Sequence, residues 1–124
     1  MEILKLTLKK KWFDMILSGE KKTEYRELKE YWVQRLFDYK SIDATPKSFL
    51  DAILEKKYPM FFYMKRYTHI QFYNGAYFSD KLPNFTIELK GLYHGKGVED
   101  WGAVKDDEYF CLELGHIVST SNGI

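Results

Sequence analysis

The sequence predicts an α+β protein with at least five mainly antiparallel strands in a curled sheet or small barrel, and with two or three helices packed on it. In the first half of the chain, apolar residues mostly recur every three or four positions, as on one face of a helix. In the second half they alternate with polar residues, as in strands with one buried face. Turns and loops link these later strands, which favours antiparallel pairing.

The composition indicates one soluble domain spanning residues 1–124. Hydrophobic residues make up 45% and charged residues 30% of the chain, as in ordinary globular proteins. No linker or internal repeat is visible, no apolar run reaches the roughly 18 residues of a membrane span, and the N-terminus lacks a signal-peptide pattern. The single cysteine, Cys111, excludes an internal disulfide. We therefore expect a cytoplasmic protein.

The first half reads as one strand followed by helices. Residues 3–8 alternate and predict a strand, and residues 10–18 then change to helical spacing. Gly19 lies where a left-handed helix stop favours glycine. Apolar residues every four positions predict a second helix over residues 28–38. A third helix should start at Thr45, a capping residue followed by proline.

Three later segments predict strands, "THIQFY", "FTIELKGL" and "EYFCLELGHIV". Asn74 and Gly75 predict a hairpin-type turn after the first of them. Residues 93–107, between the last two, are rich in glycine and predict a loop, within which "HGKG" is a turn rather than a phosphate-binding loop. The aromatic segment 58–67 is too apolar for a free loop, so it either covers the barrel or, through Phe61 and Phe62, contacts a protein partner.

The most unusual segment is "GEKKTEYRE", which follows the first helix. If it is a strand, alternation places three ionisable side chains on one face, those of Lys22, Glu24 and Arg26. The other face then carries Lys21, Thr23 and Tyr25. Burying charge is costly unless the charge is paired or engaged by a ligand. The segment is therefore either an edge strand guarded by charge or the wall of a site.

The spacing favours a site. Gly19, Lys21, Glu24 and Arg26 form the pattern G-x-K-x-x-E-x-R after a helix ending in "ILSG". With the opening "LKLTLKKKWFDMI", the "WGA" loop and the closing strand, the pattern resembles the ASCH domain of the PUA-like superfamily, especially its small bacterial and phage members. The resemblance spans nearly the whole chain. It implies a small, curled PUA-like β-barrel of about five or six mainly antiparallel strands with a cleft beside the motif. It also implies binding of RNA or modified nucleobases.

Some small members of that family are amidohydrolases that deacetylate acetylcytidine, which gives an alternative function. The resemblance implies that Lys21 matches their activating lysine, but Glu24 stands where they have a nucleophilic threonine. Thr23 lies one residue early, on the opposite face of a strand. A carboxylate in place of a hydroxyl nucleophile changes the reaction. In such an enzyme Lys21 and Glu24 would be catalytic, with Glu88 as a candidate late acid.

A binding function asks less of the same residues. Lys21 and Arg26 can hold a phosphate or a polar base edge, and Glu24 can orient them or accept from an exocyclic amine. Tyr25, Tyr73 or Tyr77 can stack on a base, and Tyr77 is favoured because it follows the Asn-Gly turn. The expected ligand is therefore RNA, a nucleotide or a modified nucleoside.

The distribution of charge and of histidine agrees with such a ligand and with no metal or cofactor. Fifteen of the 19 Lys and Arg residues lie in residues 1–66, which suggests one basic face for an anion. "KKK" at 9–11 is a helix start that can extend a basic rim near Lys21. The three histidines are far apart in sequence and lack metal-ligand spacing.

Overall fold

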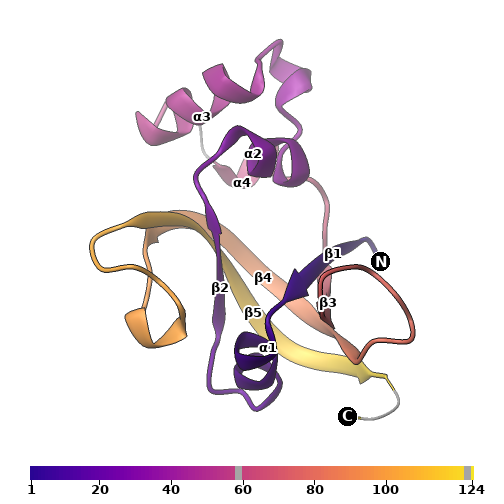
Figure 1. Cartoon of the computed structure of the whole chain (residues 1–124). Helices are drawn as coiled ribbons and strands as arrows, with labels where there is room; N and C mark the ends of the chain where they lie inside the picture. Colours follow the sequence, from indigo (N-terminus) through magenta and orange to yellow (C-terminus); the bar gives the residue numbers. More distant parts are fainter. Residues whose placement is uncertain (58–59, 122–123) are drawn as a thin grey trace.

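The computed structural model describes residues 1–57, 60–121 and 124, and only the backbone at Phe61. Its strands form one curled, mixed sheet in the order β1-β3-β4-β5-β2 (Figure 1). They are β1 (Ile3–Leu8), β2 (Thr23–Glu27), β3 (His69–Asn74), β4 (Asn84–Lys96) and β5 (Glu108–Thr120). The β1–β3 pair is parallel and the other three pairs are antiparallel. The predicted small, curled α+β barrel is confirmed as an open half-barrel.

The helices lie at two ends of this sheet (Figure 1). They are α1 (Lys10–Leu17), α2 (Glu30–Leu36), α3 (Pro46–Leu54) and α4 (Met60–Tyr63), with 3-10 turns η1 (Tyr39–Ile42) and η2 (Glu99–Trp101). Helix α3 starts as predicted, because the Thr45 side chain accepts from the Ser48 amide and Ser48 reciprocates. Helix α2 is shorter than predicted: Lys29 before it and Phe37 after it are extended. Among the described residues, no helix is long and apolar enough to cross a bilayer.

The core lies between the sheet and the helices, and it contains the strand faces that alternation predicts to be inward. The fully buried aromatic side chains are those of Phe13, Phe37, Phe49, Phe72, Tyr73, Phe85 and Phe110, and this burial removes Tyr73 as a surface for stacking. Burying a large side chain contributes about 1.5–3 kcal/mol, so these rings account for much of the aromatic content of the chain. Met60, Tyr63, Met64 and Tyr67 pack against the same core, as expected for residues 58–67. Tyr58, Pro59 and the Phe61 side chain lie outside the described residues.

Two expectations about the later strands are wrong. Asn74 does not form a tight hairpin, because it lacks the positive φ that a two-residue type I′ turn requires. Instead its amide donates to the Pro83 carbonyl at 2.9 Å, closing a wider loop. In addition, β4 runs on to Lys96 and pairs there with Glu108. The "HGKG" segment is therefore mostly strand, and the predicted glycine-rich loop shrinks to residues 97–107.

Candidate functional site

The two edge strands of the curled sheet, β1 and β2, face each other across a gap that side chains bridge. Arg26 on β2 donates from Nη2 to the Thr7 carbonyl at 3.1 Å. Arg35 on α2 donates from Nη2 to the Lys5 carbonyl at 2.9 Å. We call this junction of β1 with β2 and α2 the seam. Guanidinium groups, rather than a neighbouring strand, thus satisfy backbone carbonyls on the free edge of β1.

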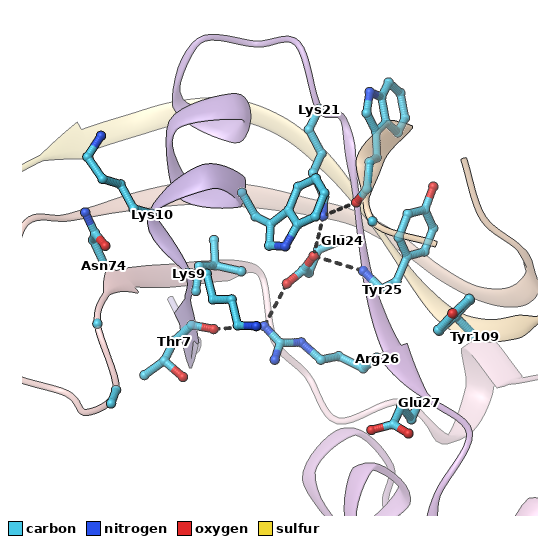
Figure 2. A pocket seen from close by; sticks show the side chains of 16 residues that line it. Thr7, Lys9, Lys10, Lys21, Glu24, Tyr25, Arg26, Glu27, Asn74 and Tyr109 are labelled. Atoms are coloured by element: carbon cyan, nitrogen blue, oxygen red, sulfur yellow. Dashed lines mark hydrogen bonds and ion pairs between the residues drawn. The ribbon is translucent and has the colours of Figure 1, made fainter. Parts of the chain in front are cut away.

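A cleft of about 830 Å³ opens on the seam (Figure 2). Its walls come from the end of β1, the start of α1, β2, the start of the loop after β3, and η2. The lining residues are Thr7, Leu8, Lys9, Lys10, Trp12, Lys21, Glu24, Tyr25, Arg26, Glu27, Asn74, Gly75, Ala76, Trp101, Gly102 and Tyr109. Segments far apart in the sequence therefore build one cavity.

The turn after α1 brings Lys21 into this cleft. Gly19 takes φ +86° at the end of the helix, and the Lys21 amide then donates back to the Met15 carbonyl at 2.9 Å. The Lys21 side chain is only 2% exposed. Its Nζ donates to the Trp101 carbonyl at 2.6 Å and pairs with Glu24 Oε1 at 2.8 Å.

This arrangement corrects the predicted faces of the charged segment. Strand β2 begins only at Thr23, so strand alternation does not determine the direction of Lys21. Lys21 joins Glu24 and Arg26 instead of opposing them (Figure 2). Lys22, expected beside Glu24, is exposed and lines a different hollow at the end of α1.

Glu24 is the centre of a buried charge cluster. Its Oε1 accepts from Lys21 and from the Tyr25 amide at 3.1 Å, and its Oε2 pairs with Arg26 Nη2 at 2.7 Å. Burying charges costs several kcal/mol per ion unless their partners are well placed, and here each charged group has one. We call Lys21, Glu24 and Arg26 the ion triad. Two cations and one carboxylate leave the triad with an excess positive charge.

Aromatic rings support both cations of the triad. The Trp12 ring centroid lies 4.6 Å from Lys21 Nζ, and the Trp32 centroid lies 5.0 Å from the guanidinium carbon of Arg26. Such contacts contribute about 0.5–2 kcal/mol each. Gly102 permits this packing, because it takes φ +104° and an added Cβ would lie 3.1 Å from the Trp12 ring.

Tyr25 lines the cleft, but it anchors a loop rather than standing free. Its hydroxyl accepts from the Val98 amide at 2.9 Å, and an added Cβ at Gly97 would lie 2.8 Å from its ring. Tyr109 packs against it with ring centroids 5.6 Å apart. Burial raises the pKa of the Tyr25 hydroxyl above its ordinary value. Tyr25 therefore forms a fixed wall and is not an open stacking surface.

Three other candidates lie outside the cleft. Tyr77 is 63% exposed and lines a neighbouring hollow that also includes Arg26. Thr23 is buried and does not line the cleft. Glu88 accepts from the His116 amide at 2.8 Å and does not line the cleft.

These positions bear on which chemistry the cleft can support. The Lys21 ammonium bonds to a carbonyl and a carboxylate, and no hydroxyl in the described part of the chain is bonded to it. A threonine hydroxyl beside the lysine, which the resemblance implies for the deacetylating members, is not among the described contacts of Lys21. Within residues 1–57 and 60–121, no group of three or more His, Cys, Asp or Glu side chains could hold a metal ion.

Sequence reasoning missed Thr7, Trp12 and Trp101 as parts of the cleft. Thr7 and Trp101 contribute backbone carbonyls, which leave no signal in residue type. Trp12 fits a helical apolar stripe, and its second role under Lys21 depends on how α1 ends. Comparison of the chain with models of protein families, with characterised proteins and with solved structures finds no match.

Proposed function

We propose that the chain binds RNA, a nucleotide or a modified nucleoside in the cleft at the seam. The observation that carries this proposal is the ion triad at the base of a cavity that has the Tyr25 ring as one wall. Binding uses the triad as it stands, whereas the alternative of an amidohydrolase needs a carboxylate or a water to complete the site beside Lys21.

The charge of the cleft favours an anion. Four cationic side chains and two carboxylates line it, a net charge of +2. Lys9 and Lys10 are exposed at its rim, whereas Lys21 is at its base. A cleft lined mainly by one sign of charge concentrates ligands of the opposite sign. A phosphate at the rim meets this condition.

The triad keeps hydrogen-bonding capacity for a ligand. Arg26 uses Nη2 for its bonds to Thr7 and Glu24, so its Nη1 donors remain for a phosphate or a base oxygen. Glu24 accepts three hydrogen bonds of the roughly four that a carboxylate can accept. The remaining site on Oε2 suits an exocyclic amine, as carboxylates accept from cytosine.

The size and setting of the cavity support the same class of ligand. Its volume of about 830 Å³ lies within the range of roughly 300–1,000 Å³ typical of small-molecule sites. The G-x-K-x-x-E-x-R pattern that resembles ASCH domains supplies the triad, so we propose membership of that PUA-like family. The free thiol of Cys111, buried on β5, fits the cytoplasm as the proposed compartment.

The test is a titration of the ribonucleoside monophosphates, cytidine, acetylcytidine and an octaribonucleotide into wild type, Lys9→Glu and Lys47→Glu. Lys9 lines the cleft, whereas Lys47 is an exposed lysine on α3. A carboxylate just before α1 is favourable to the helix, so Lys9→Glu should fold. We expect Lys9→Glu to bind anionic ligands roughly tenfold more weakly, about 1.4 kcal/mol.

Lys47→Glu should bind like wild type. Calorimetry gives the affinities, and thermal unfolding provides an independent readout because a ligand at 100 times its dissociation constant adds about 2.7 kcal/mol of stability. The absence of binding to every compound would refute the proposal. Equal losses in the two variants would move the site away from the seam.

A further inference from the structure

We infer that the ligand is a single-stranded nucleic acid whose neighbouring nucleotide stacks in a second hollow beside the cleft. This inference rests on the proposed function and adds a second subsite to it. The hollow has a volume of about 380 Å³, and we call it the aromatic shelf. It is lined by Lys5, Leu6, Thr7, Arg26, Tyr31, Trp32, Arg35, Ala76, Tyr77 and Phe78.

The shelf and the cleft are continuous. Both are lined by Thr7, Arg26 and Ala76, so one guanidinium lies at the boundary between the two hollows. A strand with one base in the cleft would pass Arg26 with its backbone and leave the next base over the shelf. Arg26 is held by Thr7 and Glu24 through Nη2, which leaves its other terminal nitrogen for the phosphate between the two nucleotides.

The charge of the shelf matches a polyanion. Lys5, Arg26 and Arg35 line it, and no carboxylate is among its described lining residues. Arg35 is fixed in position, because its Nη1 donates to the Tyr31 hydroxyl at 3.0 Å and its Nη2 to the Lys5 carbonyl. A guanidinium fixed in this way loses little conformational entropy when it binds a phosphate.

The aromatic residues of the shelf decide which polyanion fits. Tyr31, Tyr77 and Phe78 are 54%, 63% and 49% exposed, an arrangement that costs hydrophobic free energy in an unliganded surface. Flat rings between cations are how proteins bind unpaired bases, since every base has a face that can stack. A duplex keeps its bases stacked on each other, and an acidic peptide has no comparable row of flat groups. The combination therefore favours an unpaired strand.

The test compares a labelled octanucleotide with a mononucleotide of the same base, using fluorescence anisotropy and calorimetry. Wild type is measured beside Tyr77→Ala, Tyr77→Phe and the control Tyr93→Ala, an exposed tyrosine that lines neither hollow. We expect Tyr77→Ala to lower the ratio of octanucleotide to mononucleotide affinity about 5- to 150-fold, the range for losing one stacked base. Tyr77→Phe and Tyr93→Ala should keep the ratio. RNA and DNA octamers run in parallel identify the strand that is preferred.

Three results would overturn the inference while leaving the cleft intact. One is a mononucleotide that binds while the octamer gains no affinity over it. Another is an octamer whose advantage survives Tyr77→Ala. The third is equal binding of a duplex, or of polyglutamate of matched charge. Failure of the mononucleotide itself to bind would instead refute the proposed function, so the two failures are distinguishable.

Discussion

The β4–β5 hairpin and the seam hold the same sheet together in opposite ways. Strands β4 and β5 pair through their backbones from Lys96 and Glu108 to Phe85 and Thr120, with bulges on the way. At the seam, the side chains of Arg26 and Arg35 reach across from β2 and α2 to the edge of β1. Backbone pairing uses up the donors and acceptors of the hairpin. Side-chain bridging leaves space and unused hydrogen-bond donors, so the groups that can bind a ligand lie at the seam.

The largest expected effect comes from breaking the triad at its centre. Glu24→Ala leaves the buried Lys21 ammonium without its carboxylate, which costs about 3–5 kcal/mol of unfolding free energy. Urea denaturation measures the change. Glu27→Ala is the matched control, since Glu27 is exposed and pairs only at the surface with Lys29, so it should cost less than about 1 kcal/mol. Equal losses for the two variants would contradict the role of the triad.

The next largest effect comes from a buried thiol in the β4–β5 hairpin. Burial raises the pKa of the Cys111 thiol from 9.0 to about 11. The thiol therefore ionises at a lower pH in the unfolded chain than in the folded protein. Its contribution to the free energy of unfolding is complete below pH 9 and is lost as the pH rises to about 11. At 1.36 kcal/mol per pKa unit, the loss reaches at most about 2.7 kcal/mol. Denaturation between pH 8 and pH 11 should show a smaller fall for Cys111→Ala, and an identical fall would contradict burial of the thiol.

Breaking the contacts across the seam while keeping the Lys21–Glu24 pair should cost less unfolding free energy than Glu24→Ala. Arg26→Met removes the bonds to Thr7 and Glu24 but leaves the Lys21–Glu24 pair. We expect a loss of about 2 kcal/mol, as for hydrogen bonds to charged groups, together with weaker nucleotide binding. Arg66→Met, at an exposed arginine, should change neither property. Wild-type affinity in Arg26→Met would remove Arg26 from the site.

The smallest expected effect comes from α3, which belongs to neither the hairpin nor the seam. Thr45→Ala removes the cap of α3, which should cost about 1 kcal/mol. Thr45 lines neither the cleft nor the shelf. Ligand affinity, measured under conditions where the variant is fully folded, should therefore stay unchanged. Thermal unfolding and calorimetry on the same samples test both statements. A change in affinity would mean that α3 communicates with the seam.

Local signals in the sequence were enough for much of the fold. The alternation of residues 3–8 and the Thr45–Pro46 start specify their elements through nearest neighbours, and both appear as expected. The predictions of the turn at Asn74 and of the end of β4 are wrong because pairing with distant residues determines both. The Asn74 amide donates to the Pro83 carbonyl, and pairing with β5 extends β4 to Lys96.

The site was harder to read than the fold. Spacing predicted that Lys21, Glu24 and Arg26 belong together, but the alternation rule separated Lys21 from the others. The reason is that Lys21 enters from the turn after α1 and not from a strand. The backbone carbonyls that hold Lys21 and Arg26 carry no residue signal. The sequence predicts the exposed Tyr77 in the cleft, but Tyr77 lies on the aromatic shelf next to the cleft.

Amide chemical-shift mapping tests the central claim most directly. Isotope-labelled protein would be titrated with ribonucleoside monophosphates and then with the octaribonucleotide. Binding at the seam predicts shift changes concentrated in residues 7–10 and in β2, spreading to residues 31–35 and 76–78 only with the octamer. Changes confined to the β4–β5 hairpin, or none with any nucleotide, would contradict the seam as the binding site.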